Sequence, residues 1–163
     1  MAFRSTDGTI GSQPIATTDT VQNHPLGTIA TAVDPVYGAG EFIYLKGVAS
    51  TAIGSWVTYN LDDGTTTLLA ANAIGPVAVA MSANVANQYG WYQIQGKAIG
   101  LCLAGFVDNA NVYATATAGS VDDAVVAGDR VKGAVGASAI GTPSGSFAEF
   151  EIARPFMDDG LAA

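Results

Sequence analysis

Charged side chains are scarce in this sequence. Asp, Glu, Lys and Arg together make up 12% of the 163 residues, whereas typical soluble domains carry about 25%. Hydrophobic residues account for 49%, and a single domain of this length cannot bury half of its residues. Many of them are Ala and Val, which an exposed surface tolerates. Even so, we expect part of the apolar surface to be covered by other copies of the chain.

Cations are the scarcer of the two charge signs. Six Lys and Arg residues stand against fourteen Asp and Glu, which gives a formal net charge of −8. The six are scattered, so the sequence offers no basic cluster that could neutralise phosphate groups. We therefore expect no binding to nucleic acid or to anionic membranes. An acidic surface suits a soluble particle that must repel its neighbours.

Cysteine and histidine occur once each. Cys102 lies in the apolar run 99–106 and is expected to be buried. A single cysteine excludes an intrachain disulfide and fits synthesis in a reducing cytoplasm. His24 has no cluster of metal-ligand or carboxylate residues around it in the sequence, so we expect it at the surface or at an interface. The polar start of the chain predicts no signal peptide, and no apolar stretch is long and uninterrupted enough to predict a membrane span.

Catalytic patterns are also missing. The sequence contains no nucleophile elbow and no phosphate-binding glycine loop that opens a helix. Acidic doublets occur at 62–63, 122–123 and 158–159, but calcium needs six or more oxygen ligands and no such spacing follows any doublet. Turn chemistry explains them instead, and Asp62 and Asp122 are expected in corresponding loops of two related units. We expect no enzyme activity, no cofactor and no metal.

What the sequence does contain is a strand pattern that occurs twice. The first copy comprises 56–59, 75–80 and 90–94, and the second 111–114, 133–137 and 147–152. Val77 and Val135, like Ile94 and Ile152, are 58 positions apart. We predict two related strand units in which these pairs superpose, with both isoleucines buried.

The predicted fold class is all-β, a small β-barrel or β-sandwich built from these two units. Residues 1–40 are rich in Thr, Ser, Gly and Pro and are predicted to form an extended N-terminal arm that adds little to the core. Residues 41–163 are predicted to form the β-domain. Helix signals are weak, and the best candidate is the short segment 82–88.

Several runs carry a family resemblance: 24–28, 34–35, 40–47, 55–59, 73–80, 90–96 and 154–156. In their residue types and in their order along the chain, they resemble the capsid decoration (cement) proteins of tailed bacteriophages, over about residues 24–157. The resemblance implies a small β-fold that trimerises on the outer face of an icosahedral head and clamps neighbouring capsomers. The chain would then be a structural virion protein, made in the host cytoplasm, with its own copies and the major capsid protein as partners.

Large apolar and aromatic side chains supply the interface candidates. Trp91 and Tyr92 are consecutive on a predicted strand and must point to opposite faces, so we expect one in the core and the other against solvent or a partner. The full set of interface candidates is Phe3, Leu26, Ile29, Tyr37, Trp91 and Tyr92.

Three alternatives stay open from the sequence. The first is a phage head-fibre or tail component. The second is a carbohydrate-binding β-module that stacks sugars on an exposed Trp56 or Trp91. The third is a glycan-degrading enzyme, which the missing acid/base pair disfavours.

Overall fold

A computed structural model describes residues 4–5 and 13–157 of the chain. In these residues the protein is all-β, with no helix, as predicted. The strands are β1 (Arg4–Ser5), β2 (Thr18–Asp19), β3 (Ile29–Asp34), β4 (Gly38–Lys46), β5 (Trp56–Tyr59), β6 (Thr66–Leu68), β7 (Val77–Ala80), β8 (Tyr89–Leu101), β9 (Asn111–Ala114), β10 (Val121–Asp122), β11 (Arg130–Gly136) and β12 (Phe147–Met157). The segment 82–88 forms turns and bends, so the helix predicted there is wrong.

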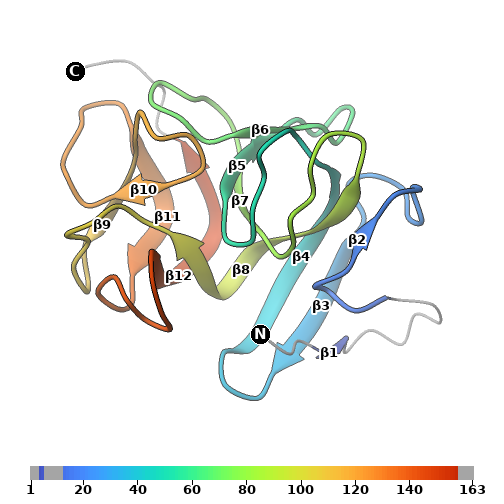
Figure 1. Cartoon of the computed structure of the whole chain (residues 1–163), viewed down its shortest axis with the longest axis horizontal. Coiled ribbons are helices and arrows are strands. Elements are labelled where there is room, and N and C mark those ends of the chain that lie inside the picture. Colours follow the sequence, from blue (N-terminus) through green and yellow to red (C-terminus); the bar gives the residue numbers. More distant parts are fainter. Residues whose placement is uncertain (1–3, 6–12, 158–163) are drawn as a thin grey trace.

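One curled antiparallel sheet organises the molecule (Figure 1). Its hydrogen-bonded order is β1-β3-β4-β8-β12-β11-β9-β10, and β5, β6 and β7 branch from β8. β8 is the longest strand, with 13 residues. Its first half pairs with β4 and its second half with β12, so this one strand belongs to both halves of the protein.

The two related units predicted from the sequence are present in the strand order. In the first unit β5 pairs with both β6 and β7, and β7 pairs with β8. In the second, β9 pairs with both β10 and β11, and β11 pairs with β12. The last strands of the units, β8 and β12, pair with each other. The units therefore share one topology and join along a common seam.

The register of the repeat differs from the prediction by two residues. Val79 is paired with Gln93 in the first unit, and Val135 with Glu151 in the second. Val135 thus corresponds to Val79, and the predicted match with Val77 is wrong. A shift of two leaves every side chain on its own face. The prediction that Ile94 and Ile152 are buried is confirmed, since they are 2% and 4% exposed.

Residues 13–40 contribute more to the core than the sequence suggested. β3 forms a six-residue ladder with β4, and Ile15, Ala30 and Ala32 are buried in a cluster with Phe42 and Tyr44. The predicted boundary at residue 40 falls inside β4. The sequence did not predict β3, because its alanines alternate with other residues and Ala has a low preference for strands.

β8 bends where its partners change. Gly96 has φ 101°, and a Cβ atom at this position would lie 2.4 Å from the carbonyl oxygen of Ala39. Only glycine fits such a conformation at so close an approach. The Gln93 amide donates hydrogen bonds to the carbonyl oxygens of Gln95 and Lys97, at 3.1 and 3.2 Å, and so braces the bend.

Candidate interaction surface

The residues predicted to carry interface contacts do not come together. Phe3 lies outside the described residues. Leu26 is half-buried against the cluster around Tyr44, and Tyr37 is half-buried in the β3–β4 turn. Ile29 is 48% exposed at the start of β3. Of the candidates within the described residues, Ile29 offers the largest accessible apolar side chain.

Trp91 and Tyr92 point to opposite faces of β8, as the alternation of a strand requires. Both are nevertheless buried, Trp91 in the cluster with Phe42 and Tyr92 in a second cluster with Ile43. The expectation that one ring faces solvent or a partner is therefore wrong. Strands β5 and β7 cover the second face, which sequence alternation alone could not reveal. Burial raises the pKa of the Tyr92 hydroxyl to about 12.

The two tryptophans offer no platform for sugars. Trp56 is fully buried and packs edge-to-face on Phe150 with ring centroids 4.9 Å apart. Trp91 is buried as well. A carbohydrate module that stacks a sugar on either ring would need it at the surface.

The titratable groups are engaged in structural contacts. Asp63 Oδ1 accepts hydrogen bonds from the backbone and hydroxyl of Thr65 in the β5–β6 turn, which lowers the pKa of this carboxyl. Asp122 lies in β10, so the expectation that it shares a loop position with Asp62 is wrong. In residues 13–157 no three His, Cys, Asp or Glu side chains are grouped as metal ligands. Cys102 is buried, and burial raises the pKa of its thiol to about 11.

His24 belongs to a packed aromatic group. Its ring lies edge-on to Tyr44 at 5.1 Å and tilted to Trp91 at 5.4 Å. The Tyr44 hydroxyl donates a 2.5 Å hydrogen bond to Asp19, which also accepts from Gln13. Burial and this bond raise the pKa of Tyr44 to about 12. These contacts hold residues 13–24 against the sheet.

One face of the curled sheet forms an open surface. Register partners share a face, and the ladders give two rows across it. One row is Thr31, Glu41, Gln95 and Ala153, and the other is Lys97, Glu151, Val135 and Asn111. On the opposite side of the sheet, behind these rows, Ala32, Phe150 and Ile152 point into the core. We call this surface the outer face.

The outer face continues past a paired bulge. Gly133 and Arg154, both with positive φ, lie beside each other where the β11–β12 register shifts. Beyond the bulge Val131 and Met157 point into the core. Arg130, Lys132 and Phe156 therefore belong to the outer face, where Phe156 is 50% exposed. Val33 and Ala39 are paired at its β3–β4 end. Arg154 and Glu149, the ion-pair partners of Glu41 and Lys97, complete it.

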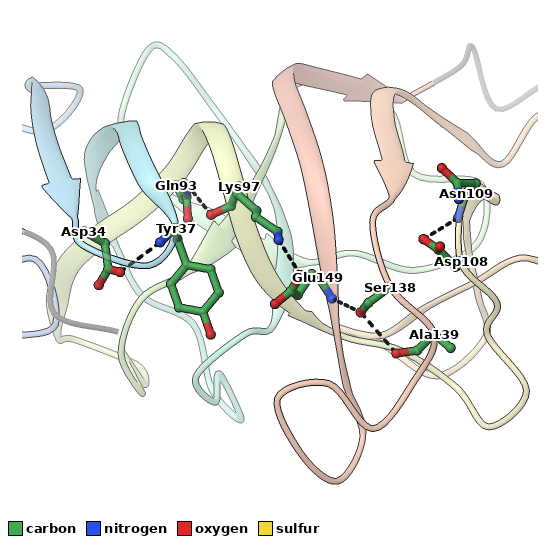
Figure 2. Close-up of polar contacts among 9 residues, drawn as sticks. All are labelled: Asp34, Tyr37, Gln93, Lys97, Asp108, Asn109, Ser138, Ala139 and Glu149. Atoms are coloured by element: carbon green, nitrogen blue, oxygen red, sulfur yellow. Dashed lines mark hydrogen bonds and ion pairs between the residues drawn. The ribbon is translucent and has the colours of Figure 1, made fainter.

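Charges on the outer face are largely matched within the chain. Lys97 Nζ lies 2.5 Å from Glu149 Oε2, and Arg154 lies 2.5 Å from Glu41 Oε2. The Arg130 guanidinium donates to Asn111 Oδ1 at 2.8 Å. Figure 2 shows Lys97 extending toward Glu149, whose backbone N–H bonds Ser138. Side chains alternate along a strand, so the sequence of 147–152 could have predicted that Glu149 and Glu151 share the solvent-facing side of β12.

A shallow groove of about 670 Å³ runs along the outer face between Lys97, Arg130 and Glu151. It exists because β11 bulges on both edges: its register shifts against β12 between 132 and 134, and against β9 between 130 and 135. Bulges are common where a strand must re-aim side chains. The groove holds charged and amide groups beside small apolar ones, a lining suited to a polypeptide surface.

A second surface lies at the β9–β10 end of the sheet. The loops 105–110 and 123–129 are tied together there by a 3.0 Å hydrogen bond from Val107 N–H to Asp123. They expose Val107, Val125 and Val126, of which Val125 is the most exposed at 80%. Asp108 and Asp123 lie in the same loops, and Asp122 adjoins them at the end of β10. We call this surface the acidic loop end.

Comparisons with protein-family models, curated proteins and solved structures give no match for this chain. Within the described residues no helix is long and apolar enough to span a bilayer.

Proposed function

We propose that this chain is a structural virion protein, a capsid decoration or cement subunit of a tailed bacteriophage. It binds the outer capsid surface as a homo-oligomer, a trimer, and stabilises the head. Its partners are its own copies and the major capsid protein. It takes no cofactor and is not an enzyme.

The observation that supports this proposal best is the outer face itself. It crosses six paired strands from β3 to β9, it is open, and most of its charges are held in place by ion pairs and hydrogen bonds. A broad, rigid sheet surface suits repeated docking on an ordered lattice, because little side-chain entropy is lost on contact. Several such contacts in one oligomer multiply a modest affinity per site.

The alternatives are less well supported by the same residues. The buried Trp56 and Trp91 leave a carbohydrate module without its stacking ring. A head-fibre or tail component would use the same kind of scaffold and differs in its location on the particle. Its location is therefore what the experiment must determine.

The test is imaging of purified phage particles from the source that encodes the chain, at a resolution that traces the polypeptide. The expected result is density for this fold on the outer head surface, at positions of three-fold or local three-fold symmetry. Density at the tail or at a fibre base would support the alternative location. Particles that contain none of this chain by mass spectrometry would overturn the proposal.

Heads stripped of the chain by mild denaturant provide a matched control. They are expected to lose DNA at a lower temperature than intact heads, and re-addition of the purified protein should restore the difference. If stripped heads lose DNA at the same temperature as intact heads, the chain binds the head without stabilising it, contrary to the proposal.

A further inference from the structure

We propose that the acidic loop end of one copy docks on the outer face of the next copy, so that the oligomer closes through head-to-tail contacts. This inference rests on the proposed homo-oligomer and goes further by assigning both sides of its interface. It starts from the distribution of charge over the fold.

Charge is divided unevenly between the outer face and the rest of the chain. The face carries four of the six cations and three of the fourteen carboxylates, a net of +1, which leaves −9 on all other residues. The four cations are Lys97, Arg130, Lys132 and Arg154. Two copies with a net charge of −8 each repel one another over most orientations. The outer face is where an acidic surface of another copy meets the least repulsion.

The acidic loop end supplies a matching surface. It presents Asp108, Asp122 and Asp123 together with exposed valines. The outer face offers cations together with exposed Val33 and Phe156. Apolar contact at the centre with opposite charges around it is the usual composition of a specific interface. Contact between two outer faces, each with a net charge of +1, would lack this complementarity.

The positions of the two surfaces determine the kind of contact. The acidic loop end lies beside β9 and β10 at one end of the sheet order, and the outer face extends to β3 at the other end (Figure 1). Two different patches in contact form a heterologous interface, which closes into a ring when the rotation between copies allows it. A three-membered ring is the smallest such assembly above a pair and agrees with the proposed trimer.

Substitutions of opposite sign at the two surfaces test the pairing. Val125→Lys adds a cation to the acidic loop end and should raise the dissociation constant of the oligomer at least about tenfold, more than Val125→Glu. At Phe156 the order should reverse, with Phe156→Glu more damaging than Phe156→Lys. The double variant Val125→Lys/Phe156→Glu should recover part of the loss. Leu61→Lys and Leu61→Glu, at the 73% exposed Leu61 of the β5–β6 turn, serve as matched controls and should change nothing.

Thiol cross-linking gives an independent readout, because the natural Cys102 is buried. A Val125→Cys preparation mixed with a Phe156→Cys preparation should cross-link through a short bis-maleimide, while each preparation alone should not. Sedimentation equilibrium and circular dichroism of every variant establish the mass and the fold.

The outcomes separate this inference from the function it rests on. Cross-linking of the Val125→Cys preparation alone would indicate a two-fold contact and overturn the head-to-tail arrangement. An oligomer unaffected by all four charge variants would also overturn it, while the homo-oligomer itself would stand. A wild-type chain that remains monomeric in solution and on heads would refute both.

Discussion

Arg154 and Glu41 form an ion pair between residues 113 positions apart in the sequence. The pair joins β12 to β4 and passes over β8 at Gln95, the residue whose register partners are Glu41 and Ala153. Both side chains remain partly exposed, and exposed ion pairs contribute little, about 0–1 kcal/mol. The pair fixes the geometry of the outer face more than it stabilises the fold.

Replacement of Arg154 should show this small contribution. Arg154 has φ 46°, a conformation that costs a residue with a side chain about 1–2 kcal/mol. Arg154→Ala loses the ion pair and keeps the strain, so it should lower the free energy of unfolding by no more than about 1 kcal/mol. Arg154→Gly loses the same pair and relieves the strain, so it should be at least as stable as wild type in urea unfolding. An Arg154→Gly variant less stable than Arg154→Ala would contradict this reasoning.

Gly96 should tolerate no side chain. Gly96→Ala places a methyl group against the Ala39 carbonyl in a left-handed conformation, and we expect a loss of about 2–4 kcal/mol from overpacking and backbone strain together. Gly141→Ala is the matched control, because Gly141 has φ 98° with open space around its Cβ position. It should lose only the strain contribution. Chemical denaturation of the two variants measures the difference, and equal losses would show that the close approach at Gly96 relaxes freely.

Stability should fall at alkaline pH through two tyrosines. Tyr44 and Tyr92 have pKa values of about 12 in the folded protein, raised from 10.0 mainly by burial. Unfolded tyrosine ionises near 10, so above that pH the unfolded chain releases protons that the folded chain retains, and unfolding becomes more favourable. The buried Cys102 thiol, whose pKa is raised to about 11, adds to this decline at its lower end. The free energy of unfolding should be flat up to about pH 8 and decline between about pH 9 and 12.

The measurement is urea unfolding across this range, together with the tyrosinate absorbance of the native protein. Tyr44→Phe should flatten part of the decline, since it removes one of these groups. A native absorbance titration centred near pH 10 for all tyrosines would refute the prediction.

Deletion of residues 1–35 should now unfold or severely weaken the protein. The deletion removes β3, Ile15 and the Asp19 partner of Tyr44. It would therefore open the cluster around Phe42 to water, whereas the sequence alone had predicted a folded remainder. Far-UV circular dichroism and a thermal scan of the truncated chain decide between the two. A cooperative transition close to that of the full chain would show that β3 is dispensable.

Local patterns predicted much of this fold and few of its contacts. The strand over 56–59 was predicted with its observed bounds, and Cys102 was correctly expected in the core. The strand predicted over 90–94 is too short, because β8 continues through a bend at Gly96 to Leu101. Ser82 and Asn84 formed a bonded turn where a helix was predicted.

The interface candidates were harder to predict because exposure depends on distant strands. Trp91 and Tyr92 point to opposite faces as predicted, yet β5 and β7 cover the ring of Tyr92. The residues near Tyr92 in the sequence do not indicate that these strands pack over it. The groove arises from bulges at Gly133 and Arg154, which depend on how β11 meets β9 and β12. Register between strands far apart in sequence is set by the whole sheet.

The continuity of β8 has a mechanical consequence. A force applied to β4 passes through the β4–β8 hydrogen bonds into β8, along its backbone, and through the β8–β12 hydrogen bonds into β12. The hydrogen bonds of each ladder share this load, so the strands resist sliding past one another. If one half unfolded first, β8 would lose its pairing on that side while still belonging to the other half, so we expect the two halves to unfold together. Pulled from its ends in a single-molecule experiment, the protein should rupture in one event and show no intermediate step.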